Sequence, residues 1–283
     1  MSRVSDAIAK ANADGRAALI VYLPAGFPDM DTSRACLEAA AAAGADLLEV
    51  GFPYSDPLMD GPTIQQANQV AMDAGYTPSD DFEMCGRLTA AIDVPAVVMT
   101  YYNICWHFPV PARRLADARP HHGVPDGLEG FAGAAAQAGL AGAIIPDLPV
   151  AESGPWLDAA AAADLASIFL VASTSDDTHL ADAADASTGF VYATSTLGVT
   201  GARESLSQRA RPLVERLRRV TDRPVCVGIG VSTAVHARTV AGFADGVIVG
   251  SAAVRAVADG GPDAVTALVA DLAEGCRRGY RRS

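Results

Sequence analysis

The sequence predicts an α/β fold, a closed (β/α)8 barrel of the TIM type, in one domain spanning residues 1–283. Two observations predict it. Eight short apolar runs rich in β-branched residues recur at roughly even spacing, and alanine-rich segments of helical period separate them. A continuous apolar run is typical of a parallel strand that is buried on both faces. Eight such units in about 250 residues fit a closed barrel better than the alternative, an open flavodoxin-like sheet with an additional domain.

The elements follow from these patterns in chain order. Residues 1–10 have an amphipathic helical pattern that contains an acidic residue, unlike a signal peptide. An N-terminal helix therefore precedes the barrel, and extra helices are expected beyond the eight units. Two helices should begin at Ser232 and Ser251, after glycine turns. The strands are expected at residues 17–23, 46–51, 96–101, 142–146, 167–172, 189–194, 224–228 and 245–250, and further helices at residues 31–43, 64–74, 127–138 and 205–220.

The composition limits the possible partners and the cellular compartment. Half of the residues are hydrophobic, 19% are charged, and the net charge is −12. Nucleic acids and anionic membranes need a Lys/Arg footprint, so we expect neither as a partner. The five cysteines are scattered without a C-x-x-C pair, which suits a reducing cytosol and no structural zinc. No apolar run approaches the ~20 residues of a membrane span. We therefore expect a soluble, cytoplasmic protein.

The distribution of lysine excludes one kind of catalysis. Lys10 is the only lysine, and the other twenty basic residues are arginines. Lys10 lies in the predicted N-terminal helix, before the first strand. Arginine cannot be deprotonated to provide the amine of a Schiff base. Carbon–carbon bond cleavage through a lysine imine is therefore not expected, and any such chemistry must use acid/base catalysis.

A strand-and-loop unit at residues 46–63 contains the most informative residues of the chain. Glu49 lies near the C-terminal end of the second predicted strand, and Asp56 and Asp60 lie in the loop that follows. A carboxylate within an apolar strand is costly to bury unless it has a partner or a task. Glu49 and a loop aspartate could form a general acid/base pair. The alternative is an ion-paired strand glutamate with two turn-forming aspartates.

Glycines near the C-terminal ends of the last three strands predict a phosphate site. Gly230 and Gly250 belong to short turns that open helices, and Ser251 adds a hydroxyl. Glycine permits close backbone approach, and helix N-termini present free N–H groups to an anion. Barrels often bind phosphate at the loops after strands 7 and 8. Gly201, in the loop after strand 6, would add a third backbone donor. The alternative is that these glycines only shape tight turns.

These motifs together resemble the tryptophan synthase α-subunit family. The resemblance runs in order from about residue 19 to residue 258, nearly the whole chain. It rests on residues 49–65 (EVGFPYSDPLMDGPTIQ), 24–28 (PAGFP), 101–103 (YYN), 146–149 (PDLP), 198–201 (GVTG), 228–230 (GIG) and 245–251 (DGVIVGS). It implies a lyase that cleaves indole-3-glycerol phosphate to indole and glyceraldehyde 3-phosphate by retro-aldol chemistry, without cofactor or metal.

The resemblance also implies roles for single residues. Glu49 would shuttle protons, Asp60 would accept a hydrogen bond from the indole N–H, and Thr200 would close over the site and bind Asp60. The phosphate would be held by Gly201, Gly230, Gly250 and Ser251. The indole pocket would be lined by Tyr22, Met99, Tyr101, Ile144, Leu170, Tyr192 and Ile229. Each apolar pocket residue alone would also suit plain barrel core, and a tyrosine at a barrel mouth often only satisfies a neighbour.

The family resemblance implies a partner as well. Its α subunit pairs with a pyridoxal-phosphate β subunit in an α2β2 complex and passes indole to it through a tunnel. Pro53, Asp56 and Asn103 lie in the two segments that form this contact, residues 53–60 and the stretch after Asn103. Asp56 is therefore a better candidate for the interface than for chemistry.

The chain departs from the family pattern mainly at residues 104–125. This connection is longer than usual and rich in Pro, Arg and His, and His121 and His122 suit an exposed turn better than a metal site. It falls where the β subunit would bind. This motivates one alternative, a stand-alone lyase that releases indole for a specialised pathway. Two others are a non-catalytic activator of a β subunit, against which Glu49, Asp60 and Thr200 together speak, and a phosphosugar isomerase or epimerase, which the carboxylate pair and the lack of metal ligands disfavour. Two milder departures are residues 172–175 (ASTS), where the family favours proline, and Ile229 in place of an aromatic residue.

Overall fold

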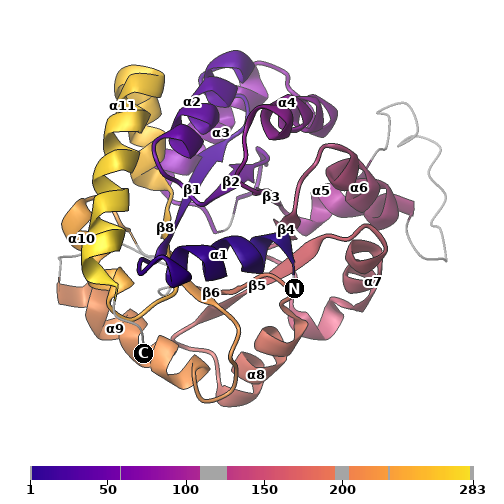
Figure 1. The fold of residues 1–283 in the computed structure, drawn as a ribbon. Coiled ribbons are helices and arrows are strands. Elements are labelled where there is room, and N and C mark those ends of the chain that lie inside the picture. Colours follow the sequence, from indigo (N-terminus) through magenta and orange to yellow (C-terminus); the bar gives the residue numbers. More distant parts are fainter. Residues whose placement is uncertain (1, 58, 109–125, 195–203, 229, 281–283) are drawn as a thin grey trace.

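Eight parallel strands close into a barrel in the computed structural model, which describes residues 2–57, 59–108, 126–194, 204–228 and 230–280. Each strand pairs with its sequence neighbours, and β8 pairs with β1 to complete the ring. The barrel predicted from the sequence is confirmed (Figure 1). The strands are β1 (Ala18–Pro24), β2 (Leu47–Gly51), β3 (Ala96–Met99), β4 (Gly142–Ile144), β5 (Ala166–Ala172), β6 (Val191–Thr194), β7 (Val225–Gly228) and β8 (Gly246–Val249).

Helices surround the barrel in the order that the alanine-rich segments predict (Figure 1). Several begin with a side-chain cap; Asp29, for example, accepts a hydrogen bond from the Thr32 amide at the start of α2. The helices are α1 (Arg3–Ala13), α2 (Met30–Ala42), α3 (Pro62–Asp73), α4 (Pro78–Ala91), α5 (Tyr102–His107), α6 (Asp126–Gln137), η1 (Val150–Glu152), α7 (Gly154–Ala162), α8 (Asp177–Ala186), α9 (Glu204–Leu217), α10 (Ala234–Ala241) and α11 (Ser251–Gly279).

Helix α1 closes the N-terminal end of the barrel. It lies across that end in Figure 1, and its buried residues Val4 and Ile8 belong to the same apolar cluster as the interior of the barrel. A capping box of Ser2 and Ser5 begins the helix. The interior side chains of this cluster include Ile20, Leu47, Val97, Ile144, Ile168, Phe190, Cys226 and Ile248.

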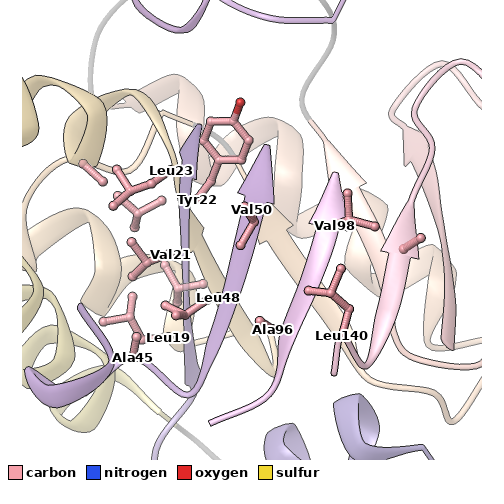
Figure 2. Close-up of a cluster of buried hydrophobic side chains, with 14 of the residues drawn as sticks. Leu19, Val21, Tyr22, Leu23, Ala45, Leu48, Val50, Ala96, Val98 and Leu140 are labelled. Atoms are coloured by element: carbon pink, nitrogen blue, oxygen red, sulfur yellow. The ribbon is translucent and has the colours of Figure 1, made fainter. Parts of the chain in front are cut away.

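A second, larger core fills the layer between the barrel and the helices. Figure 2 shows part of it, with Leu19 and Val21 along β1 and Leu48 and Val50 along β2. Because alternate residues of a strand point to opposite faces, these residues pack outward while Glu49 and Tyr22 point inward. Burial on both faces explains why the strands read as continuous apolar runs.

Several elements differ from the sequence expectation; β4 ends two residues earlier than expected, at Ile144, and β6 begins two residues later, at Val191. Strand β3 ends at Met99, and Asn103 lies in the short helix α5 instead of at a strand end. Helix α10 begins at Ala234 because Thr233 caps it, so it starts two residues later than predicted. Residues 109–125, the main part of the unusual connection, lie outside the described residues.

Candidate active site

Glu49 lies in the interior of the barrel near its C-terminal end. It is the central residue of β2, and its register partners are Tyr22 on β1 and Val97 on β3. The side chain is fully buried, and neither carboxyl oxygen has a hydrogen-bond partner within the described parts of the chain. Burial alone raises the pKa of Glu49 to about 8, because the charged form loses its hydration. This carboxyl therefore holds a proton at neutral pH.

Asp60 reaches the same end of the barrel from the loop that leads into α3. Its carboxyl accepts a hydrogen bond from Asn68 Nδ2 at 3.2 Å and hydrogen-bonds the Tyr101 hydroxyl. Its backbone carbonyl accepts from Gln65 Nε2 at 2.9 Å. Burial raises the pKa of Asp60 to about 6, while the bonds from Tyr101 and Asn68 act in the opposite direction. Asp60 is therefore mostly a carboxylate at pH 7, where Glu49 is mostly protonated.

Three tyrosines, Tyr22, Tyr101 and Tyr192, lie close to the two carboxyls. Burial raises the pKa of Tyr22 well above its ordinary value, and the charges of Asp60 and Glu49 add to the effect. The same two carboxyls raise the pKa of Tyr192, again after burial. The electrostatic effect of a carboxylate on a tyrosine pKa decreases with distance, so these effects indicate that the groups lie close together. The structure therefore gathers Glu49, Asp60, Tyr22, Tyr101 and Tyr192 at one mouth of the barrel.

Glycines make room for two of these rings. A Cβ atom built on Gly51 would lie 2.2 Å from the Tyr22 hydroxyl, and one on Gly228 would lie 2.4 Å from the Tyr192 hydroxyl. Both glycines stand on the strand next to the tyrosine. The glycine of each pair is thus required by packing, which the sequence motifs alone do not reveal.

The predicted phosphate residues lie at the ends of β7 and β8. Gly250 is the N-cap of α11 and Ser251 is its first residue, with no side chain capping this terminus. Gly230 has φ +50°, a left-handed conformation that favours glycine. At the neighbouring N-terminus of α10, two amides already have protein partners. The Thr233 side chain accepts from the His236 amide, and Asp271 of α11 accepts from the Ala234 amide. The α11 terminus is therefore the better anion site. Gly201, Thr200 and Ile229 lie outside the described residues.

A cavity of about 380 Å³ opens at the same mouth. Among the residues expected to line an indole pocket, Leu170 contributes to its wall, Ile144 belongs to the interior cluster, and Met99 and Tyr192 pack against that cluster, as Leu170 also does. Tyr22 and Tyr101 are buried beside Asp60. The cavity is lined by Met59, Pro146, Leu170, Val171, Ala172, Thr174, Ser175 and Thr194.

Sequence reasoning missed several residues of this site. Met59 could have been found from its position beside Asp60, and its amide donates to the Tyr101 hydroxyl at 3.1 Å. Asn68 could have been found as a polar residue on the buried face of α3, between Ala67 and Ala71. The hydrogen bond from Tyr101 to Asp60 had no signal in the sequence.

The residues expected at an interface lie on the surface beside the mouth. Asp56 and Asn103 are exposed and Pro53 is half-buried. Aromatic rings surround them: Tyr54 stacks on Tyr101 with ring centroids 4.9 Å apart, and Trp106 is 41% exposed. No group of three or more His, Cys, Asp or Glu side chains that could hold a metal occurs in the described ranges. Among the helices described, none is long and apolar enough to cross a membrane.

A buried carboxyl, Glu49, and a half-buried one, Asp60, with separated pKa values lie with an uncapped helix N-terminus at the carboxyl mouth of a parallel barrel, which is typical of a barrel enzyme that uses acid/base catalysis. The profile of the family described as "Tryptophan synthase alpha chain" matches residues 8–278. The chain belongs to this family, whose reaction is the cleavage of indole-3-glycerol phosphate.

Individual relatives agree. The chain is 46% identical over 281 residues to the tryptophan synthase alpha chain of Streptomyces avermitilis, covering 98% of this chain and 95% of that one. A structure of Mycobacterium tuberculosis tryptophan synthase is similar with a TM-score of 0.84 and 42% identity, over 98% of both chains. The alpha chain from Legionella pneumophila subsp. pneumophila gives a TM-score of 0.79 at 27% identity, over 98% of this chain and 97% of that one. The family and the reaction predicted from the sequence are confirmed.

Proposed function

We propose that Glu49 and Asp60 carry out the retro-aldol cleavage of indole-3-glycerol phosphate without any cofactor. The observation that carries the proposal is that a fully buried carboxyl without a partner, Glu49, and a half-buried one, Asp60, lie at one mouth with separated pKa values, about 8 and about 6. At neutral pH the first is a proton donor and the second an anionic acceptor, which is the division of roles that the reaction needs.

The steps balance with these two groups alone. Protonated Glu49 gives its proton to C3 of the indole ring, and the ring nitrogen becomes positively charged. The Glu49 carboxylate then takes the proton of the hydroxyl on the adjacent side-chain carbon. The bond between that carbon and C3 breaks, its electron pair neutralises the ring nitrogen, and the carbon becomes the aldehyde of glyceraldehyde 3-phosphate. Asp60 accepts a hydrogen bond from the ring N–H and stabilises its transient positive charge.

The sequence and the fold support an imine-free route. Lys10, the single lysine, is exposed on α1 at the opposite end of the barrel from Glu49. The phosphate of the substrate would bind at Gly230, Gly250 and Ser251, with Gly201 from the loop after β6. Thr200 would close over the substrate and join Asp60. The indole would lie among Tyr22, Met99, Tyr101, Ile144, Leu170, Tyr192 and Ile229.

The proposed partner is a β subunit that carries pyridoxal phosphate, in an α2β2 complex in the cytoplasm. The exposed Asp56 and Asn103 beside half-buried Pro53 support a docking surface at the mouth, and the relatives of known structure include tryptophan synthase from M. tuberculosis. The chain would be one domain, in which residues 104–125 modify this surface. The length of that segment is also the observation that favours the second candidate, a lyase that acts without a β subunit.

The test is indole formation from indole-3-glycerol phosphate, with and without added β subunit, for the wild type and four variants. Glu49→Gln and Asp60→Asn should each lose most activity, and Glu129→Gln, at an exposed position, is the matched control. Asp56→Asn should keep the activity of the isolated chain but reduce stimulation by the β subunit. Full activity of Glu49→Gln would contradict the catalytic assignment. High turnover of the isolated wild type, unchanged by the β subunit, would favour the stand-alone lyase.

A further inference from the structure

The loop after β5 is held by hydrogen bonds of its own residues. It consists of residues 173–176, between β5 and α8. The Ser175 amide donates to the Ala172 carbonyl at 3.0 Å, and the Ala172 amide donates to Ser175 Oγ at 3.2 Å. The conformation of this loop therefore depends on its hydrogen bonds.

Arg216 fixes the loop from outside. This residue lies near the C-terminal end of α9, and its guanidinium contacts three groups of the loop and of the first turn of α8. Nη2 donates to the Ser175 carbonyl at 2.7 Å and to Asp177 Oδ1 at 2.7 Å, and Nε donates to the same oxygen at 3.0 Å. Nη1 reaches the Ser173 carbonyl at 3.5 Å. One planar side chain thus spans both ends of the loop.

The ion pair alone does not explain this arrangement. The Asp177 side chain is 79% exposed, and an exposed ion pair stabilises a protein very little. The hydrogen bonds to the Ser173 and Ser175 carbonyls have a different effect from the ion pair, because they fix the position of the backbone of residues 173–175. A lysine would keep the positive charge, but it lacks the planar, forked guanidinium group that donates to a carbonyl and a carboxylate at the same time.

The loop forms one wall of the cavity at the mouth. Five lining residues come from β5 and this loop: Leu170, Val171, Ala172, Thr174 and Ser175. Met59, which precedes Asp60 in the chain, lines the same cavity. A displacement of the loop would therefore change the shape of this cavity at the same mouth as the proposed catalytic carboxyls.

We propose that Arg216 is a positioning residue that sets the substrate affinity of the site by fixing the wall formed by residues 172–175. It touches no reacting atom. The inference rests on the proposed use of this mouth as the substrate site. Because the wall contacts the substrate before and during the reaction alike, its loss should weaken ground-state and transition-state binding equally, which raises KM and leaves kcat nearly unchanged.

The test compares four variants for KM and kcat of indole formation in the full chain, with β subunit present. Arg216→Ala should raise KM roughly tenfold with kcat within about twofold, since it removes several charge-assisted bonds at once. Arg216→Lys should give an intermediate KM, and Asp177→Asn should change KM by less than about twofold, because it spares the carbonyl contacts. Arg219→Ala, at an exposed position three residues further along, is the matched control. Hydrogen exchange of residues 170–180 should increase in Arg216→Ala but not in Arg219→Ala.

The outcomes separate this inference from the proposed function. If the wild type forms no indole, the proposed function is wrong. If the wild type is active and Arg216→Ala is folded with an unchanged KM, the positioning role is overturned and Arg216 only supports the fold. If Arg216→Ala does not fold, Arg216→Lys decides: a KM equal to that of the wild type would refute the role of the fork.

Discussion

Replacing Glu49 with glutamine should stabilise the ligand-free protein, and by an amount that grows with pH. Burial raises the pKa of Glu49 from 4.5 to about 8. Between these values the folded protein holds a proton that the unfolded chain has released. The free energy of unfolding contributed by this group is therefore highest below pH 4.5, decreases as the pH rises, and becomes constant above pH 8. Glutamine has a similar shape but does not titrate.

The magnitude follows from the two pKa values. They differ by about 3.5, and each unit corresponds to about 1.4 kcal/mol, so burial of this carboxyl costs about 5 kcal/mol when it is fully ionised. Relative to the wild type, Glu49→Gln should gain roughly 1 kcal/mol of this amount at pH 5 and roughly 4 to 5 kcal/mol at pH 9. The amide has its own cost of burial, which shifts both values equally. The pH dependence of the difference is thus the quantity to measure.

The assay is urea unfolding of the wild type and of Glu49→Gln at five pH values from 5 to 9. Glu129→Gln serves as the control, because it makes the same chemical change at an exposed position. A difference for Glu49→Gln that is constant over this range would show that Glu49 is solvated or paired in solution, and the reasoning about its proton would fail.

Three further predictions concern the same mouth. The kcat/KM of the wild type should follow a bell-shaped curve, rising as Asp60 ionises near pH 6 and falling as Glu49 loses its proton near pH 8. In Asp60→Asn the rise of this curve near pH 6, its acid limb, should disappear along with most of the activity. An unchanged acid limb would show that another group causes the rise. Asn68→Ala removes a donor to the Asp60 carboxyl and should move the acid limb to higher pH, whereas Gln69→Ala, which alters only an exposed bond to Asp73, should leave the profile unchanged. Gly51→Ala should lower the free energy of unfolding by about 1 to 3 kcal/mol, because its Cβ would overlap the Tyr22 ring. Gly133→Ala, in a helix with open space around it, should instead be neutral or stabilising by up to about 1 kcal/mol, and equal effects at the two glycines would contradict the packing argument.

The barrel could be predicted from the sequence because each strand is buried on both sides. Residues such as Leu19 and Ile20 face different cores yet are equally apolar, so the strand appears as a continuous run. Glu49 could be singled out from the sequence because it interrupts such an apolar run. Boundaries were less accurate, since they depend on single hydrogen bonds. Thr233 caps α10 in place of Ser232, and that choice depends on which hydroxyl meets the His236 amide.

Contacts across the barrel could not be predicted. Asn68 and Tyr101 meet Asp60 from two different elements, and nothing in a linear pattern relates them. The same holds for Arg216, whose partners Ser175 and Asp177 are about forty positions away in the chain. Such pairs arise from the closure of the barrel, which brings the loops of separate β/α units together.

Helix α1 has a consequence for the movement of the product. Its residues Val4, Ile8 and Ala11 pack with the apolar side chains of the barrel interior and close the N-terminal end, whereas the proposed catalytic carboxyls lie toward the other end. With the role proposed for Glu49, indole would form toward the end of the barrel at which the cavity beside Met59 and the exposed Asp56 and Asn103 lie. A partner bound at that end would lie on the side to which the product is directed, because α1 blocks the opposite end of the barrel.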